Sequence, residues 1–91
     1  MTTVDDFNYK SSDTSLATYL ICKGLELISI DYSKPRYEYT FQTNTKKLKQ
    51  TAEKHSNDYI IGQALVDPAL FTRVNRKLVR IVKNELQWDG Q

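Results

Sequence analysis

The chain has 91 residues with 13 Lys or Arg and 11 Asp or Glu, so its formal net charge is +2. This length suits one domain with a modest core and excludes a multidomain protein. One Cys and one His exclude an internal disulfide and a four-ligand Cys/His zinc site. Apolar runs are far shorter than the roughly 20 residues of a membrane span. We therefore expect a single domain over residues 1–91 that needs no metal or other cofactor and contacts no membrane.

The first six residues are mostly polar and end in two aspartates, which is typical of a solvated tail and unlike a signal peptide. A lone thiol suits a reducing compartment. We therefore expect a polar tail over residues 1–6 and a cytoplasmic, intracellular location.

The first predicted elements are a short strand and a helix. Residues 7–10 alternate apolar and polar side chains, which is the period of a strand. Asp13 is a suitable N-cap, because its carboxylate accepts hydrogen bonds from the free amides of a first helical turn. The helix is expected to run to Lys23 and to stop at Gly24, which favours the left-handed turn after a helix. Its apolar face comprises Leu16, Ala17, Leu20 and Ile21, with Thr18 and Cys22 on the opposite side.

A β-hairpin is predicted over residues 25–43. Within residues 25–33, Ile28, Ile30 and Tyr32 alternate with polar residues, which indicates a strand with one buried face. Leu25 and Leu27 are out of phase with this set, so a bulge or the strand start is expected near residues 27–28. Residues 33–35 supply the turn, and residues 36–43 alternate again. One face of that second strand carries Tyr37, Tyr39 and Phe41.

Two helices are predicted after the hairpin. The first begins at Asn44 or Thr45 and ends by residue 62. Asp67 and Pro68 start the second, because a proline at the first helical position lacks only an amide that the helix does not need. This last helix is expected to run to about Trp88 and to span the whole sheet. The apolar stripe of the first helix is Leu48, Ala52, His55 and Tyr59, and that of the last is Leu70, Phe71, Val74, Leu78, Ile81, Val82 and Leu86.

The predicted order is β-α-β-β-α-α, which defines an α+β domain. The first helix lies between two strands and is therefore a crossover, while the hairpin adds an antiparallel pair. We expect a small three-stranded sheet covered by two or three helices, in two layers.

The stretch SDTSLATYL at residues 12–20, followed by Lys23 and Gly24, resembles the opening of a family of short phage, plasmid and prokaryotic proteins known only as a domain of unknown function. The family opens with a strand and an aspartate-capped helix of the type Asp-x-x-Leu-Ala-x-x-Leu. After a hairpin the family has an aromatic residue, then a Gly, ahead of a Val-Asp helix start. That aromatic residue is more often Trp, so Tyr59 departs from the family pattern. The resemblance covers most of residues 7–83 and implies a small accessory protein of a phage or other mobile element, with no established activity to transfer. The residues of this chain that match the later part of the family pattern are Tyr59, Gly62, Val66, Asp67 and Phe71.

Basic residues are concentrated in residues 46–83, which hold nine bases and three acids. Five bases on the last helix fall within an arc of about 120°, from 3.6-residue geometry, with no acid among them. Three are Arg, whose planar fork suits phosphate. A solvated face of an amphipathic helix would show the same pattern. The arc comprises Arg73, Arg76, Lys77, Arg80 and Lys83, and Lys46, Lys47 and Lys49 could extend it from the start of the preceding helix, where bases oppose the helix dipole.

Three other features have a candidate function and a simpler structural explanation. The aromatic face of residues 37–41, with Arg36 nearby, could stack on bases, but the same side chains would form the core face of the sheet beneath the last helix. Cys22 would need a neighbouring base to become reactive, and the sequence places no His beside it. His55 lies on an apolar stripe without a nucleophile partner, as a buried or boundary histidine would.

We therefore predict a small non-enzymatic accessory protein that binds the phosphates of nucleic acid through the basic arc. The sequence contains no catalytic motif and leaves little room for a deep pocket. The alternative is a protein–protein interaction module, an adapter or an inhibitor, that contacts a partner through its edge strand, the Cys22 face or the tyrosine-rich sheet. The sequence leaves open the choice between DNA and RNA and the oligomeric state.

Overall fold

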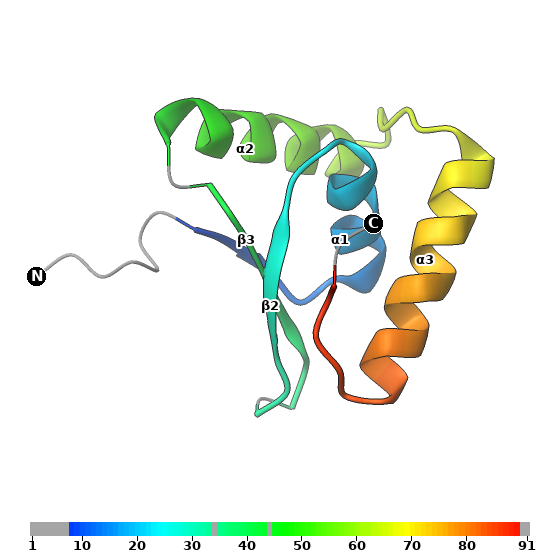
Figure 1. The fold of residues 1–91 in the computed structure, drawn as a ribbon. Helices are drawn as coiled ribbons and strands as arrows, with labels where there is room; N and C mark the ends of the chain where they lie inside the picture. The colour runs from blue at the N-terminus through cyan, green and yellow to red at the C-terminus, as the bar shows by residue number, and fades with distance from the viewer. Residues whose placement is uncertain (1–7, 34, 44, 90–91) are drawn as a thin grey trace, which may run out of the picture.

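The computed structural model describes residues 8–33, 35–43 and 45–89. Figure 1 shows a small sheet, with the first helix lying between its strands and the last helix. The fold is an α+β fold with a three-stranded antiparallel sheet, which confirms the predicted class and order. Its elements are β1 (Tyr9–Ser11), α1 (Thr14–Cys22), β2 (Leu27–Asp31), β3 (Glu38–Phe41), α2 (Lys46–Ile60) and α3 (Pro68–Lys83). The first predicted strand thus begins and ends later than expected, and its residue 7 lies outside the described residues.

The sheet has the order β1-β3-β2, and β3 pairs antiparallel with both neighbours. A register shift between Leu27 and Ser29 confirms the bulge that the sequence predicts near residues 27–28. Because an extra residue changes which side chains face the core, Leu27 and Ile30 are buried while Ile28 is 44% exposed. The prediction that Ile28 belongs to the buried face was therefore wrong.

Helix α1 forms the centre of the core. It begins as predicted, since the Asp13 carboxylate accepts a hydrogen bond from the Leu16 amide at 3.1 Å, and it ends before Gly24, whose φ is +94°. Every residue from 16 to 21 is buried. The prediction that Thr18 faces away from the core was therefore wrong. The reason is that α1 packs against β1, α2 and α3 at once, so more than one of its faces is covered.

The aromatic side chains of β3 belong to the core. Tyr39 and Phe41 are fully buried, and the Tyr39 hydroxyl lies 2.7 Å from Thr14 Oγ1 at the start of α1. The helix over this face is therefore α1, and not the last helix as the sequence suggested. Tyr37 packs edge-on against Tyr32, with ring centroids 5.1 Å apart. Since fully buried rings offer no face to a base, we assign Tyr39 and Phe41 to packing.

Helix α2 begins at Thr45, whose hydroxyl accepts a hydrogen bond from the Leu48 amide at 3.1 Å. The other predicted start, Asn44, lies outside the described residues. Leu48 is 37% exposed, so it contributes less to the core than the predicted stripe implied. The buried polar residue of α2 is Ser56, whose Oγ lies 2.6 Å from the Tyr9 hydroxyl and joins the helix to β1.

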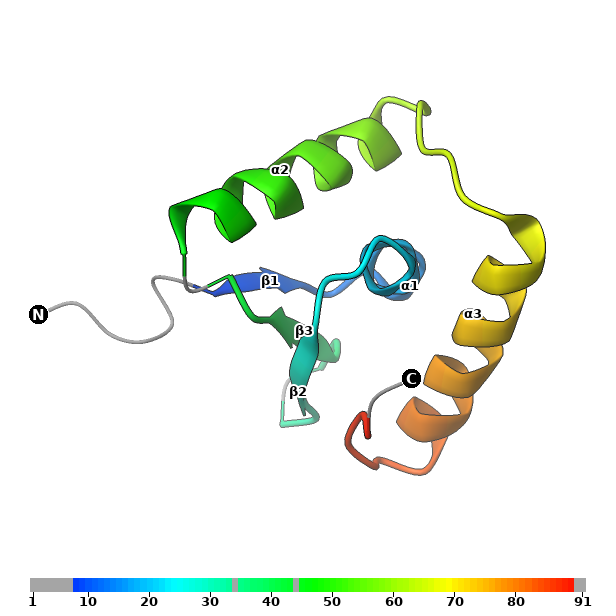
Figure 2. The same cartoon turned by 45° about the horizontal axis from the view of Figure 1, so that its top comes forward.

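Helix α3 begins at Asp67 and Pro68, as predicted, and the Asp67 carboxylate accepts a hydrogen bond from the Ala69 amide at 3.3 Å. It packs against α1 (Figure 2) and does not span the sheet as expected. It also ends at Lys83, well before the predicted Trp88. Glu85 has a φ of 53°, and this left-handed residue turns the chain out of the helix. Leu86 is consequently 55% exposed instead of buried.

The segment of residues 84–89, named the C-terminal segment below, returns from the end of α3 and lies between α3 and β2 (Figure 1). Its Gln87 side chain bonds to the main chain of Ile30 in β2. The Tyr32 hydroxyl donates a hydrogen bond to the Leu86 carbonyl oxygen. Trp88 packs against the hydrophobic core, which settles a placement that the sequence alone left open.

Candidate nucleic-acid interface

The solvent side of α3 carries the five bases that the sequence places in one arc. Arg73, Arg76, Arg80 and Lys83 are exposed, and Lys77 is half-buried. The opposite side of the helix is buried against α1, so packing determines which side faces solvent. The 16 residues of α3 include no acid. The helix therefore presents a face of one charge sign along its length, which we call the basic face.

An open groove follows the first three turns of this face. Its volume is about 670 Å³. The charged residues that line it are cations. The lining comprises Pro68, Ala69, Thr72, Arg73, Arg76, Lys77 and Arg80.

Lys77 differs from the other bases because the C-terminal segment covers it. Its Nζ lies 2.9 Å from Asp89 Oδ1 and 4.6 Å from the centroid of the Trp88 ring. The hydrogen bond and positive charge of Lys77 hold the pKa of the Asp89 carboxyl below its usual range. The basic face thus receives one acid from outside α3. Sequence reasoning missed this contact, because a helix continuing to residue 88 would carry Asp89 several turns beyond Lys77.

The structure does not bring Lys46, Lys47 and Lys49 together with the bases of α3. These three residues lie in the first turn of α2, whereas the last turn of α2 is the one that leads to α3. Both views show the start of α2 on the far side of the molecule from α3 (Figures 1 and 2). An extended patch across both helices would therefore need a ligand that wraps around the protein.

Cys22 is a half-buried free thiol at the end of α1. Burial raises the pKa of this thiol, and the nearby charges of Arg73 and Lys23 counter that effect only in part. Because the thiolate is the reactive form, this environment disfavours nucleophilic chemistry. Within the described part of the chain, no three His, Cys, Asp or Glu side chains gather as metal ligands would.

His55 packs edge-on against the ring of Tyr19, with centroids 6.1 Å apart. Its Nδ1 atom is buried and has no hydrogen-bond partner among the described residues. Burial lowers the pKa of this imidazole, and the positive charges of Lys23 and Lys54 lower it further. The folded protein therefore favours the neutral ring, as expected for a boundary histidine.

This arrangement predicts a pH-dependent stability. A histidine pKa below the ordinary value near 6.5 means that the unfolded chain binds the proton more tightly than the folded one. We expect the thermal midpoint to be highest above about pH 6.5 and to fall as the pH is lowered through the folded pKa. His55 is the only histidine, so His55→Phe should remove this part of the decline in a melting series between pH 7 and 5. An imidazole pKa at or above 6.5, measured by NMR on the folded protein, would contradict the assignment.

The family model of DUF5659, a domain of unknown function, matches residues 6–78. This match covers most of the chain, so the protein belongs to that family, and the resemblance stated from the sequence is confirmed. Searches among curated proteins and among solved structures give no significant match. None of the helices in the described residues has the length and apolarity needed to cross a membrane. The family brings no activity with it, so the function has to be argued from the surface itself.

Proposed function

We propose that the protein is a small non-enzymatic accessory protein that binds nucleic acid through the basic face of α3. One observation carries the proposal: the bases occupy the solvent side of a helix whose other side is buried, and no acid of α3 lies among them. In this mechanism Arg73, Arg76, Arg80 and Lys83 bind phosphates, while Lys77 is held by Asp89. The predicted origin in a phage or other mobile element and the predicted cytoplasmic location remain predictions.

The geometry favours phosphate contacts over the reading of bases. Helix α3 has 16 residues and is therefore about 24 Å long, so it holds its bases in a fixed row beside an extended backbone. Arg forks bind phosphate oxygens through two donors. The amide side chain within α3 is Asn75, and its Oδ1 lies 3.0 Å from the Thr18 hydroxyl in the contact with α1. Since amides are the usual partners of adenine edges, its engagement there supports binding without sequence preference.

A salt titration tests this proposal. Labelled duplex DNA, single-stranded DNA and RNA are titrated with protein at several salt concentrations between 50 and 200 mM. Four phosphate contacts predict that the logarithm of the binding constant for duplex DNA falls against the logarithm of the salt concentration with a slope of about −3.6, because each contact contributes about −0.9. Absence of binding at 50 mM, or binding that does not respond to salt, would contradict the proposal. The second outcome would favour the alternative of a protein–protein interaction module.

A further inference from the structure

The outer edge of β2 already binds a peptide-like group from the chain itself. Gln87 Oε1 accepts a hydrogen bond from the Ile30 amide at 2.8 Å, and Gln87 Nε2 donates one to the Ile30 carbonyl oxygen at 2.9 Å. These are the two bonds that a residue of a neighbouring strand would make with Ile30. Because β2 lies at the end of the strand order, its main chain at Ile30 is directed outward. The edge therefore has the geometry that accepts an added strand.

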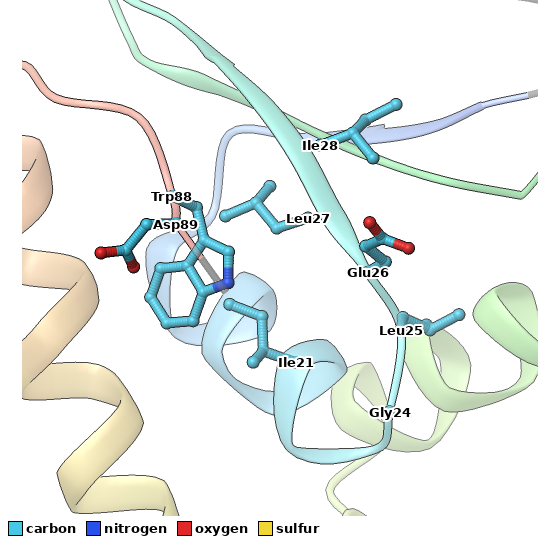
Figure 3. Close-up of a pocket in the computed structure, with 8 residues that line it drawn as sticks. All are labelled: Ile21, Gly24, Leu25, Glu26, Leu27, Ile28, Trp88 and Asp89. Carbon is cyan, nitrogen blue, oxygen red and sulfur yellow. The ribbon is translucent and has the colours of Figure 1, made fainter. Parts of the chain in front are cut away.

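Beyond Gln87 the C-terminal segment leaves a groove of about 500 Å³ beside residues 25–28. Figure 3 shows that Trp88 forms one wall of it and the chain leading into β2 the other, with Ile21 and Leu27 pointing toward the indole ring. Asp89 points away from β2, toward α3, where it meets Lys77. The groove thus occupies the space where a further strand would lie beside β2.

The charges around this groove indicate which strand it would accept. The exposed carboxylate of Glu26 lines the groove, and no base does; Asp89, which also lines it, is paired with Lys77, and Asp31 lies further along β2. A second copy of the chain, pairing through its own β2, would bring acids against acids, which destabilises a cross-strand pair. Nucleic acid is disfavoured for the same reason. A strand with basic side chains is complementary.

We infer that the edge formed by residues 25–28 binds an extended segment of a partner protein, in which basic and apolar side chains alternate. The partner backbone pairs with this edge as an added strand, around the two groups that are already bonded, namely the Leu25 amide (to the Leu20 carbonyl oxygen) and the Glu26 carbonyl oxygen (to the Gln42 amide). One apolar side chain rests on Trp88, and a basic side chain faces Glu26. This inference stands apart from the proposed function, because it uses the edge of the sheet and the acidic side of the C-terminal segment.

Trp88 is the only tryptophan in the chain, so its fluorescence reports on this groove directly. The probe is a six-residue peptide that alternates lysine and valine, with both ends blocked. We expect a saturable change in Trp88 emission and amide shifts confined to the residues around the groove, 21–30 and 87–89, in a two-dimensional NMR spectrum of the 91-residue chain. A peptide alternating glutamate and valine should produce neither effect. The lysine peptide with alternate main-chain nitrogens methylated should also fail, because it cannot pair with the edge.

Variants of the protein supply the matched control. Glu26→Lys should weaken binding of the lysine peptide by about fivefold, since it replaces an attraction with a repulsion. Glu53→Lys, which makes the same charge change on the exposed side of α2, should leave binding unchanged. The inference is overturned if the lysine peptide causes no saturable change, if the methylated peptide binds equally well, or if both variants weaken binding alike. Amide shifts in residues 24–30 that depend on protein concentration alone would assign the edge to a second copy instead.

Discussion

Replacing Arg76 and Arg80 by glutamate should abolish nucleic-acid binding at 200 mM salt and leave the thermal midpoint nearly unchanged. Both side chains are exposed on the basic face, so their replacement leaves the packing of α3 on α1 intact, and exposed substitutions usually change stability by less than about 0.5 kcal/mol. Two of the four proposed phosphate contacts are lost, and the residual log–log salt slope falls to about −1.8. The two new carboxylates also repel the phosphates. Binding is measured by the titration described above, and folding by circular dichroism.

The matched control for this double variant is Lys46→Glu with Lys47→Glu. It changes the net charge by the same amount but places the new acids at the start of α2, away from α3. We expect it to retain most of the affinity. Equal losses in the two double variants would mean that overall charge drives binding, and the basic face would lose its assigned role. Wild-type affinity in the Arg76 and Arg80 variant would show that the surface was wrongly chosen.

Leu78→Ala should lower the free energy of unfolding by about 2–5 kcal/mol, the range observed when a buried leucine is truncated. Leu78 is fully buried where α3 packs against α1, so the substitution removes apolar contacts and leaves a cavity. A domain of this size has about 5–15 kcal/mol of stability in total, so the variant should be severely weakened. At about 4–8 °C per kcal/mol the thermal midpoint should fall by at least about 8 °C.

The neighbouring Val79 provides the control for this core substitution. It is 47% exposed, so Val79→Ala removes surface that already contacts water and should cost less than about 0.5 kcal/mol. Urea unfolding of both variants, followed by circular dichroism, gives the two free energies. Similar losses for the two would mean that α3 does not dock on α1 through the face that carries Leu78.

Most of the fold follows from local signals in the sequence. Asp13, Thr45 and Asp67 each cap a helix as their side-chain chemistry predicts, and the period-two stretches form strands. The misplaced features depend on contacts between distant elements. Thr18 is buried because α3 covers the second side of α1, and nothing in the local pattern of α1 encodes that contact.

The candidate interface was likewise predictable where it depends on local geometry and unpredictable where it depends on contacts between distant elements. The five bases of α3 share a face because helical geometry alone determines it. Their relation to Lys46 depends on the path between α2 and α3, which the sequence does not fix. The contact of Lys77 with Asp89 requires the chain to reverse at Glu85. A left-handed glutamate carries no recognisable signal, unlike the glycine that usually occupies such a position.

Gln87 also covers part of a sheet edge that could otherwise pair with the edges of other chains. An uncovered sheet edge is a template for indefinite stacking of chains, and proteins protect such edges by shortening or covering them. Here β1 forms one edge with only three residues, and the Gln87 amide occupies both main-chain groups of Ile30 on the other. A ladder of stacked chains that ran along the whole of β2 would thereby be interrupted at Ile30. Loss of Gln87 and the residues after it would expose the main chain of Ile30, and such a truncated chain should aggregate more readily than the 91-residue chain.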